Sequence, residues 1–401
     1  MTTGLDDKRL VEQARVNPYQ GLGETAFWAT AVAQKNMFDI GPLWEPRFAV
    51  ARRDKAVTFG SCFAQHFGRA LAAKGFHWLN AEPAPELLSA ESAAKFNYGI
   101  FSARTGNIYT ASLLRQWVSW AKGEAAPAGE VWELEGRFHD PFRPAIEPGG
   151  FASAGELRRS RDVAIAAFRT CLTESDVFVF TLGLTESWVN SEHGYEYPMC
   201  PGTVAGEFDA VRHRFVNQDY QSVRATLADV LVQIRQLNHR IKFLLTVSPV
   251  PLTATMSGQH VLVATMESKS ILRAVAGSIV RELSNCDYFP SYEIINGTPY
   301  RGTFFEANQR NVNASGVAHV MKQFFDAMNA RFPFQDAESK AEPEEPELPD
   351  RETLEAMRRI QRRDARRQAA GRSARAEASA RADDVCEEEL LAAFAGQGRA
   401  D

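Results

Sequence analysis

Apolar residues occur along this chain either in short continuous runs or in longer segments with helical spacing. The short runs cover residues 55–59, 176–182 and 241–247 and are rich in β-branched and aromatic residues, which is typical of strands buried on both faces of a parallel sheet. The longer segments repeat apolar residues every three or four positions, which predicts helices with one buried face. These segments are residues 110–122, 153–173, 220–238, 261–283 and 313–332.

The alternation of strands and helices predicts the α/β fold class. We expect a three-layer α/β/α domain with a mostly parallel sheet, of the flavodoxin-like kind, in which residues 287–295 supply the last strand-like run. Parallel α/β sheets carry their sites at the carboxyl ends of the strands. A nucleotide binder of this fold is the weaker interpretation, because no Gly-x-Gly-x-x-Gly or Walker pattern follows any strand.

The composition divides the chain into three parts. Residues 1–49 are expected to form an irregular leader that packs on the folded body, and residues 50–333 hold all the predicted strands and form the main domain. Residues 334–401 are rich in Glu, Pro, Ala and then Arg, which predicts a charged tail that is partly disordered and partly helical. Near its end, a short amphipathic segment presents Leu390, Leu391 and Phe394 to a possible protein partner.

Charge and cysteine content narrow the class of protein. A net charge of −5 over 401 residues gives no reason to expect nucleic acid as a partner of the core. The five cysteines are widely spaced and lack CxxC pairs, which favours reduced thiols over a zinc site or a disulfide scaffold. No apolar run has the length of a membrane span, and no secretory leader is evident. We therefore expect a cytoplasmic protein without metal or cofactor.

The first predicted strand ends in Gly60 and Ser61, and a helix follows at once. Glycine permits a tight turn, so Ser61 is expected at the helix N-terminus, where free N–H groups and the helix dipole favour an anion. Acyl transfer through a serine needs such a place, but serine is also a preferred N-cap residue. Both interpretations of Ser61 are open at this point.

The string Gly60-Ser61-Cys62-Phe63-Ala64 resembles the signature of the GSCFA family, a branch of the SGNH/GDSL-like hydrolases. The resemblance implies an SGNH-type sheet and a nucleophilic role for Ser61. Gly106-Asn107, residues 182–188, Ser248-Pro249-Val250 and Ser268-Lys269-Ser270 also resemble the family pattern.

The resemblance also suggests where an oxyanion and a substrate would bind. The N–H of Ser61 and donors near Gly106-Asn107 suit an oxyanion, although a plain turn and helix cap explain the second pair equally well. Thr185 and Glu186 stand where the wider group carries Asn and Asp, and Glu186 is either a site carboxylate or a loop residue. The residues expected to bind oxyanion or substrate are Gly60, Cys62, Gly106, Asn107, Asp140, Arg143, Thr185, Asn308 and Asn311.

Asp140 and Arg143 lie in a Pro-rich stretch that either lines a pocket for a polar substrate or fixes its own loop through an ion pair. The histidine expected for a base is missing, because Asn308-Gln309-Arg310-Asn311 replaces the Asp-x-x-His of SGNH-like enzymes. Asparagine cannot accept a proton at neutral pH. His260, in a loop near the expected active edge, is therefore the first choice for the base.

Two functions remain. In the first, Ser61, His260 and Glu186 form the catalytic set of an esterase or O-acyltransferase. The family resemblance suggests that its substrate is a small or glycan acyl ester, most simply an acetylated carbohydrate. In the second, the domain is catalytically inactive and binds a glycan or another polar ligand. The missing Asp-x-x-His favours binding, and the Gly60-Ser61 turn favours hydrolysis.

Overall fold

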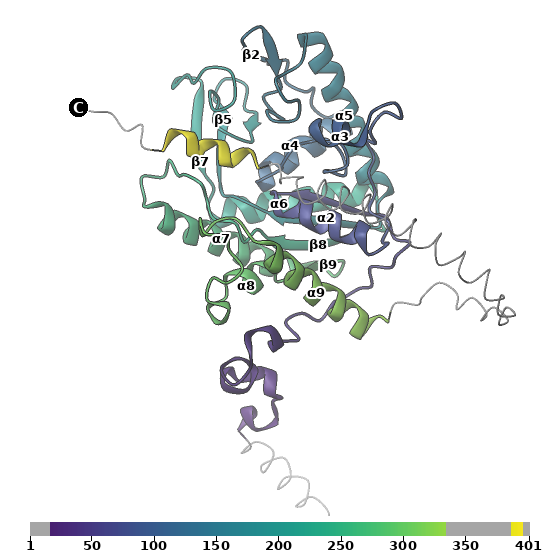
Figure 1. Ribbon diagram of the computed structural model, residues 1–401, viewed down its shortest axis with the longest axis vertical. Coiled ribbons are helices and arrows are strands. Elements are labelled where there is room, and N and C mark those ends of the chain that lie inside the picture. Colours follow the sequence, from purple (N-terminus) through teal and green to yellow (C-terminus); the bar gives the residue numbers. More distant parts are fainter. Residues whose placement is uncertain (1–16, 334–385, 396–401) are drawn as a thin grey trace, which may run out of the picture.

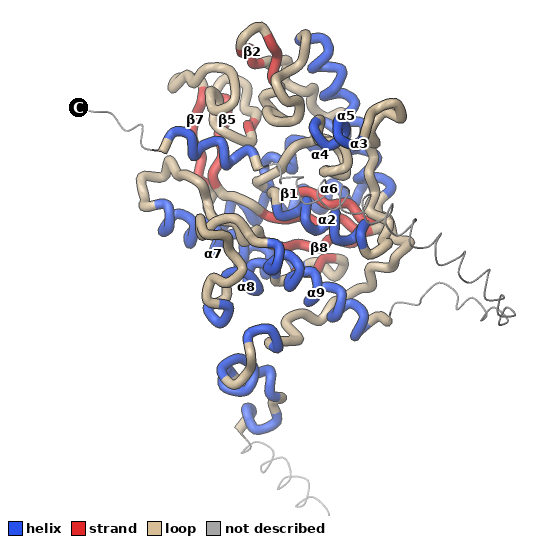
Figure 2. The backbone as a smooth tube through the Cα atoms, in the orientation of Figure 1, coloured by secondary structure: helices blue, strands red, loops and turns tan. Residues whose placement is uncertain are grey.

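A four-stranded parallel sheet forms the centre of the protein in a computed structural model that describes residues 17–333 and 386–395 (Figures 1 and 2). The strand order is β1-β4-β8-β9. The strands are β1 (Ala56–Gly60), β4 (Val177–Leu182), β8 (Lys242–Val247) and β9 (Cys286–Tyr288). The predicted α/β class with a parallel sheet is confirmed, and the first three strands begin and end within a residue or so of the predicted bounds.

Helices cover both faces of this sheet. Phe59, Phe178 and Phe243 belong to the larger core, on the face covered by four helices. These are α4 (Ala111–Lys122), α5 (Ala154–Glu174), α6 (Tyr220–Leu237) and α7 (Val261–Glu282). Alternate strand residues, such as Val179 and Leu244, belong to the second core on the opposite face. Its helices are α2 (Phe63–Ala73), α8 (Ser291–Asn296) and α9 (Ala314–Arg331). The short α3 (Ala90–Lys95) lies outside both cores.

Residues 287–295 do not form a single strand. Strand β9 ends at Tyr288, and α8 begins at Ser291 after Pro290, which has no N–H for a sheet hydrogen bond. A second difference is a three-stranded antiparallel sheet, β6-β5-β7, that the sequence pattern does not reveal. Its strands are β5 (Glu186–Asn190), β6 (Glu196–Tyr197) and β7 (His213–Asn217). A small hairpin of β2 (Trp132–Leu134) and β3 (Arg137–His139) completes the strands of the described residues.

The described part of the N-terminal leader contacts the domain mainly near its end. Trp44 stacks on Phe324 with ring centroids 5.4 Å apart, whereas Trp28 is 67% exposed in a part that projects from the body (Figure 1). The Arg-rich part of the predicted tail lies outside the described residues, but its end is present as a 3-10 helix, Glu387–Phe394. None of the helices described here is both long and apolar enough to cross a membrane.

Candidate active site

Ser61 lies directly after β1, at the carboxyl edge of the central sheet. Gly60 has a left-handed backbone with φ of 125°, and a Cβ atom there would lie 2.2 Å from the carbonyl oxygen of Thr181 on β4. Only glycine therefore fits the turn from β1 to α2. The Ser61 N–H donates to the same carbonyl at 3.1 Å, which holds Ser61 against the neighbouring strand.

The Ser61 hydroxyl is buried and has no hydrogen-bond partner among the described residues. The N-cap of α2 is the adjacent, buried Cys62, and no side chain caps this helix. The Ser61 side chain therefore does not act as a cap. Because a buried hydroxyl without a partner is unfavourable, this group is suited to interact with a bound molecule.

We expect Ser61→Ala to leave the free energy of unfolding unchanged or to raise it by about 1 kcal/mol, because the substitution removes a buried hydroxyl without a partner. Ser291→Ala is the matched control. Ser291 is fully buried and donates to the Val247 carbonyl at 3.0 Å, so its loss should cost about 1 kcal/mol. Urea denaturation measures both effects. An equal loss in the two variants would contradict the assignment of a free Ser61 hydroxyl.

The loop before α4 is fixed next to Ser61. The Ile108 N–H donates to the Gly60 carbonyl at 2.8 Å, and the Tyr109 carbonyl accepts from the Gly183 N–H at 3.0 Å. A Cβ atom at Gly183 would lie 3.1 Å from Cβ of Ser61. The ends of β1 and β4 and this loop thus converge on Ser61.

Asn107 presents its amide group from this loop. Its Oδ1 accepts from Gln65 Nε2 on α2 at 3.1 Å, and its Nδ2 donates to the Tyr109 hydroxyl at 3.2 Å. Asn107 is buried and the neighbouring Gly106 has φ of 69°. A buried N–H donor held in this way is suited to stabilise an oxyanion. The geometry is compatible with the role expected for Gly106 and Asn107.

Lys269 was named in the sequence analysis only within Ser268-Lys269-Ser270 and was not selected as a site residue. Its Nζ donates to the carbonyl of Gly183 at 2.7 Å, and Gly183 packs against Ser61. Burial lowers the pKa of Lys269 to about 8, although Glu388 partly offsets this shift. The signal in the sequence was a polar pair, Ser268-Lys269, on the apolar face of a predicted helix.

The second predicted block, after β4, has other partners. The Thr185 N–H donates to Ser268 Oγ at 3.2 Å and its hydroxyl donates to Asn217 Oδ1 at 2.8 Å, so both donors are engaged away from Ser61. The Glu186 carboxylate accepts from the Thr255 hydroxyl at 2.5 Å. Burial raises the pKa of Glu186.

His260 is exposed at the N-terminus of α7. Its Nδ1 accepts from the Leu262 N–H at 3.2 Å, which makes it the N-cap of that helix. Since the Ser61 hydroxyl has no partner among the described residues, His260 is not hydrogen-bonded to it here. The predicted role of His260 as a base stays a prediction.

The loop that replaces Asp-x-x-His forms a turn held by its own polar groups. Asn308 Oδ1 accepts from the N–H groups of Arg310 and Asn311, each at 3.0 Å. Arg310 points to the C-terminal segment, where its guanidinium lies 3.2 Å from the Glu388 carboxylate. The loop thus supplies a cation that pairs with the C-terminal segment.

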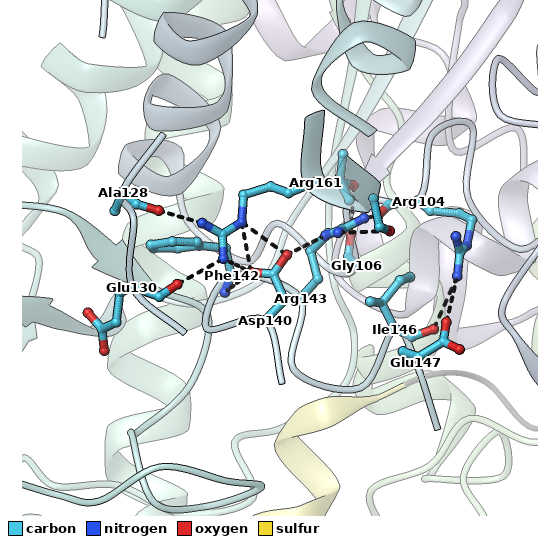
Figure 3. A network of polar contacts seen from close by, with 12 residues as sticks. Arg104, Gly106, Ala128, Glu130, Asp140, Phe142, Arg143, Ile146, Glu147 and Arg161 are labelled. Atoms are coloured by element: carbon cyan, nitrogen blue, oxygen red, sulfur yellow. Dashed lines mark hydrogen bonds and ion pairs between the residues drawn. The ribbon is translucent and has the colours of Figure 1, made fainter. Parts of the chain in front are cut away.

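Asp140 and Arg143 form a buried ion-pair network with Arg161 (Figure 3). The Asp140 carboxylate lies 2.8 Å from Arg143 Nε and 2.8 Å from Arg161 Nη2, and all three side chains are at most 2% exposed. Burial raises the pKa of Asp140, but the two arginines outweigh it and hold the pKa below its usual value. Arg143 also donates to the Arg104 carbonyl at 3.1 Å. These contacts support the loop-fixing interpretation of the pair.

Comparison with known proteins places the chain in a family. The GSCFA family model matches residues 55–324, from the first strand of the sheet into its last helix. No curated protein matches the chain. One solved structure, of a protein from Parabacteroides merdae named as a candidate GDSL-like lipase, is similar at 11% identity over 70% of this chain and 98% of that chain, with a TM-score of 0.30. The match of the family model covers more than half of the residues, and the chain belongs to the GSCFA family.

Proposed function

We propose that this protein is a serine-dependent acyl-ester hydrolase or O-acyltransferase with Ser61 as its nucleophile. The observation that carries the proposal is the buried Ser61 hydroxyl without a partner, at a strand-to-helix turn that only glycine permits. The Asn107 amide, the Ser61 N-terminal position on α2 and the family membership support it further.

In the proposed reaction the Ser61 oxygen forms a bond to the acyl carbon of an ester and gives its proton to a base. The carbonyl oxygen becomes an oxyanion, which the Asn107 Nδ2 donor is suited to bind. The alcohol leaves with the proton from the base, and an acyl-serine remains. Water then releases the acid, or a sugar hydroxyl takes the acyl group.

Two side chains are candidates for the base. His260 is expected from its position in the sequence, but in this structure it caps α7 at the surface. Lys269 is buried beside Gly183, and a pKa of about 8 leaves part of its amine neutral at physiological pH. A neutral lysine can accept the proton of a serine. We favour Lys269.

Labelling of the full chain by a serine-directed fluorophosphonate tests this assignment. We expect modification of Ser61, at a rate that increases with pH and levels off above about pH 8, because only the neutral Lys269 amine accepts a proton. Lys269→Met should abolish the labelling and His260→Ala should leave it unchanged. Labelling that persists in Lys269→Met but disappears in His260→Ala would identify His260 as the base. Labelling of Ser61→Ala as strong as that of the wild type would refute the nucleophile.

A polar groove of about 1690 Å³ lies between α4, the β2-β3 hairpin and the β6-β5-β7 sheet, and Ser61 is not among its lining residues. We propose that it holds the carbohydrate part of the substrate. Tyr195, Trp132 and the carboxylates of Glu130 and Glu196 line it. Aromatic faces next to hydroxyl-binding carboxylates suit a sugar ring. We also propose a cytoplasmic location, which the lack of disulfide bonds among the described cysteines supports.

Ligand binding without hydrolysis is the second candidate function. It is favoured by the loop at Asn308 and Asn311, which contains no proton acceptor, and by the engagement of both Thr185 donors. A chain that binds acyl sugars but shows no labelling at Ser61 with two different reagents would support this alternative.

A further inference from the structure

The C-terminal segment, residues 386–395 (yellow in Figure 1), contacts the loop before α4 that lies next to Ser61. The Glu387 carboxylate contacts Asn107 Nδ2 and accepts from the Tyr109 hydroxyl at 2.9 Å. Glu387 is 2% exposed, and a Cβ atom at Gly106 would lie 3.2 Å from its Oε1. A side chain near the chain end thus occupies the donor expected to bind an oxyanion.

The next residue provides a second anchor. Glu388 accepts from the Thr253 N–H, in the loop after β8, at 2.6 Å. Its other oxygen lies 3.2 Å from Arg310, in the loop before α9, and Glu389 lies 3.0 Å from the same guanidinium. Three separate loops of the domain therefore hold two adjacent carboxylates.

The groups around these two carboxylates are cations and hydrogen-bond donors, which suit the binding of an anion. They include the Arg310 guanidinium, the Lys269 ammonium and the amide, hydroxyl and N–H donors of Asn107, Tyr109 and Thr253. Burying a carboxylate is unfavourable unless charges and donors offset the cost. Arg310 and the Thr253 N–H do so for Glu388, whereas burial raises the pKa of Glu387 despite its hydrogen bonds to Asn107 and Tyr109. The apolar residues that were expected to dock contribute less to the attachment of the segment, since Leu390 is 44% and Phe394 is 53% exposed.

We propose that the three loops carrying Asn107, Thr253 and Arg310 form a carboxylate-binding site whose resident ligand is the Glu387-Glu388 pair of the same chain, and that residues 386–395 compete with the substrate for this site. The proposed competition between this segment and the substrate rests on the proposed function of Ser61. The Asn107 Nδ2 donor cannot serve an acyl oxygen while it is bonded to Glu387. The segment also lines an apolar cavity of about 640 Å³, to which Leu391 and Phe394 contribute together with Leu252 and Met256.

The test uses the full chain with Glu387→Lys and Glu388→Lys combined, and Leu390→Gln in the same segment as the matched control. Hydrogen exchange at the Thr253 amide should accelerate at least tenfold in the double variant and stay unchanged in the control, because this amide donates to Glu388. Labelling of Ser61 should accelerate at least tenfold as well. A synthetic peptide of residues 386–395, added to the double variant, should reverse both effects, and a peptide with both glutamates replaced by lysine should not.

Exchange and labelling that are the same in the double variant and the wild type would overturn the proposal. So would a peptide of residues 386–395 that neither restores protection at Thr253 nor slows labelling. Failure of the proposed function looks different: Ser61 is then not labelled in any variant, while Thr253 exchange still responds to the double substitution and to the peptide. In that case the results would support the carboxylate-binding site and would contradict only the hydrolase assignment.

Discussion

Gly60→Ala is expected to cost more than about 4 kcal/mol of unfolding free energy and to prevent stable folding. The added Cβ would lie 2.2 Å from the carbonyl oxygen and 2.7 Å from the nitrogen of Thr181. Both atoms belong to the backbone of β4, so no side chain can move aside to relieve the clash. Relief requires a shift of β1 against β4 at the residue that leads into Ser61. Urea denaturation or the yield of folded protein measures the loss.

The matched control is Gly75→Ala, after α2. Gly75 also has a left-handed backbone, with φ of 74°, but a Cβ atom there would meet no atom within 4 Å. We expect a loss of about 1 kcal/mol from backbone strain alone. Similar losses at Gly60 and Gly75 would mean that the backbone angle, and not the contact with Thr181, explains the glycine before Ser61.

Asp140→Asn is expected to lower the free energy of unfolding by about 3–5 kcal/mol, because it leaves Arg143 and Arg161 as buried cations without a counter-charge. Since the pKa of the Asp140 carboxyl lies below its usual value in the folded protein, its contribution to stability is complete above about pH 4 and is lost as the pH falls further. Urea denaturation at pH 7 measures the effect of the substitution.

Asp326→Asn is the control for this loss. Asp326 pairs with Lys322 at 2.5 Å, but both side chains are more than half exposed, so we expect a change of less than about 1 kcal/mol. The comparison also separates the two interpretations of Asp140. If Asp140→Asn kept its stability but lost affinity for a polar substrate, the result would favour the interpretation in which Asp140 and Arg143 line a substrate pocket.

The sequence was informative wherever a short local pattern fixes the backbone. The apolar runs at β1, β4 and β8 identify buried strands. A strand covered on both faces has no solvent-facing side, so its sequence does not alternate between apolar and charged residues. Gly60-Ser61 predicted the tight turn from β1 into α2, because only glycine fits the backbone at that turn. The antiparallel β6-β5-β7 sheet was missed because its strands are short, and β5 and β7 are only partly buried.

Tertiary structure decided which side chains lie near the Gly60-Ser61 turn. Glu387 and Asn107 are 280 positions apart, and no periodicity links them. Lys269 belongs to a helix whose spacing indicates a buried face but not which carbonyl a lysine on that face reaches. His260 follows the expected strand edge in sequence, yet its ring caps α7, because a helix N-terminus has free N–H groups that a nearby acceptor satisfies. Sequence alone determined the fold class and the Gly60-Ser61 turn, because both follow from local patterns. Packing of distant loops determined which cations, amides and carboxylates lie near that turn.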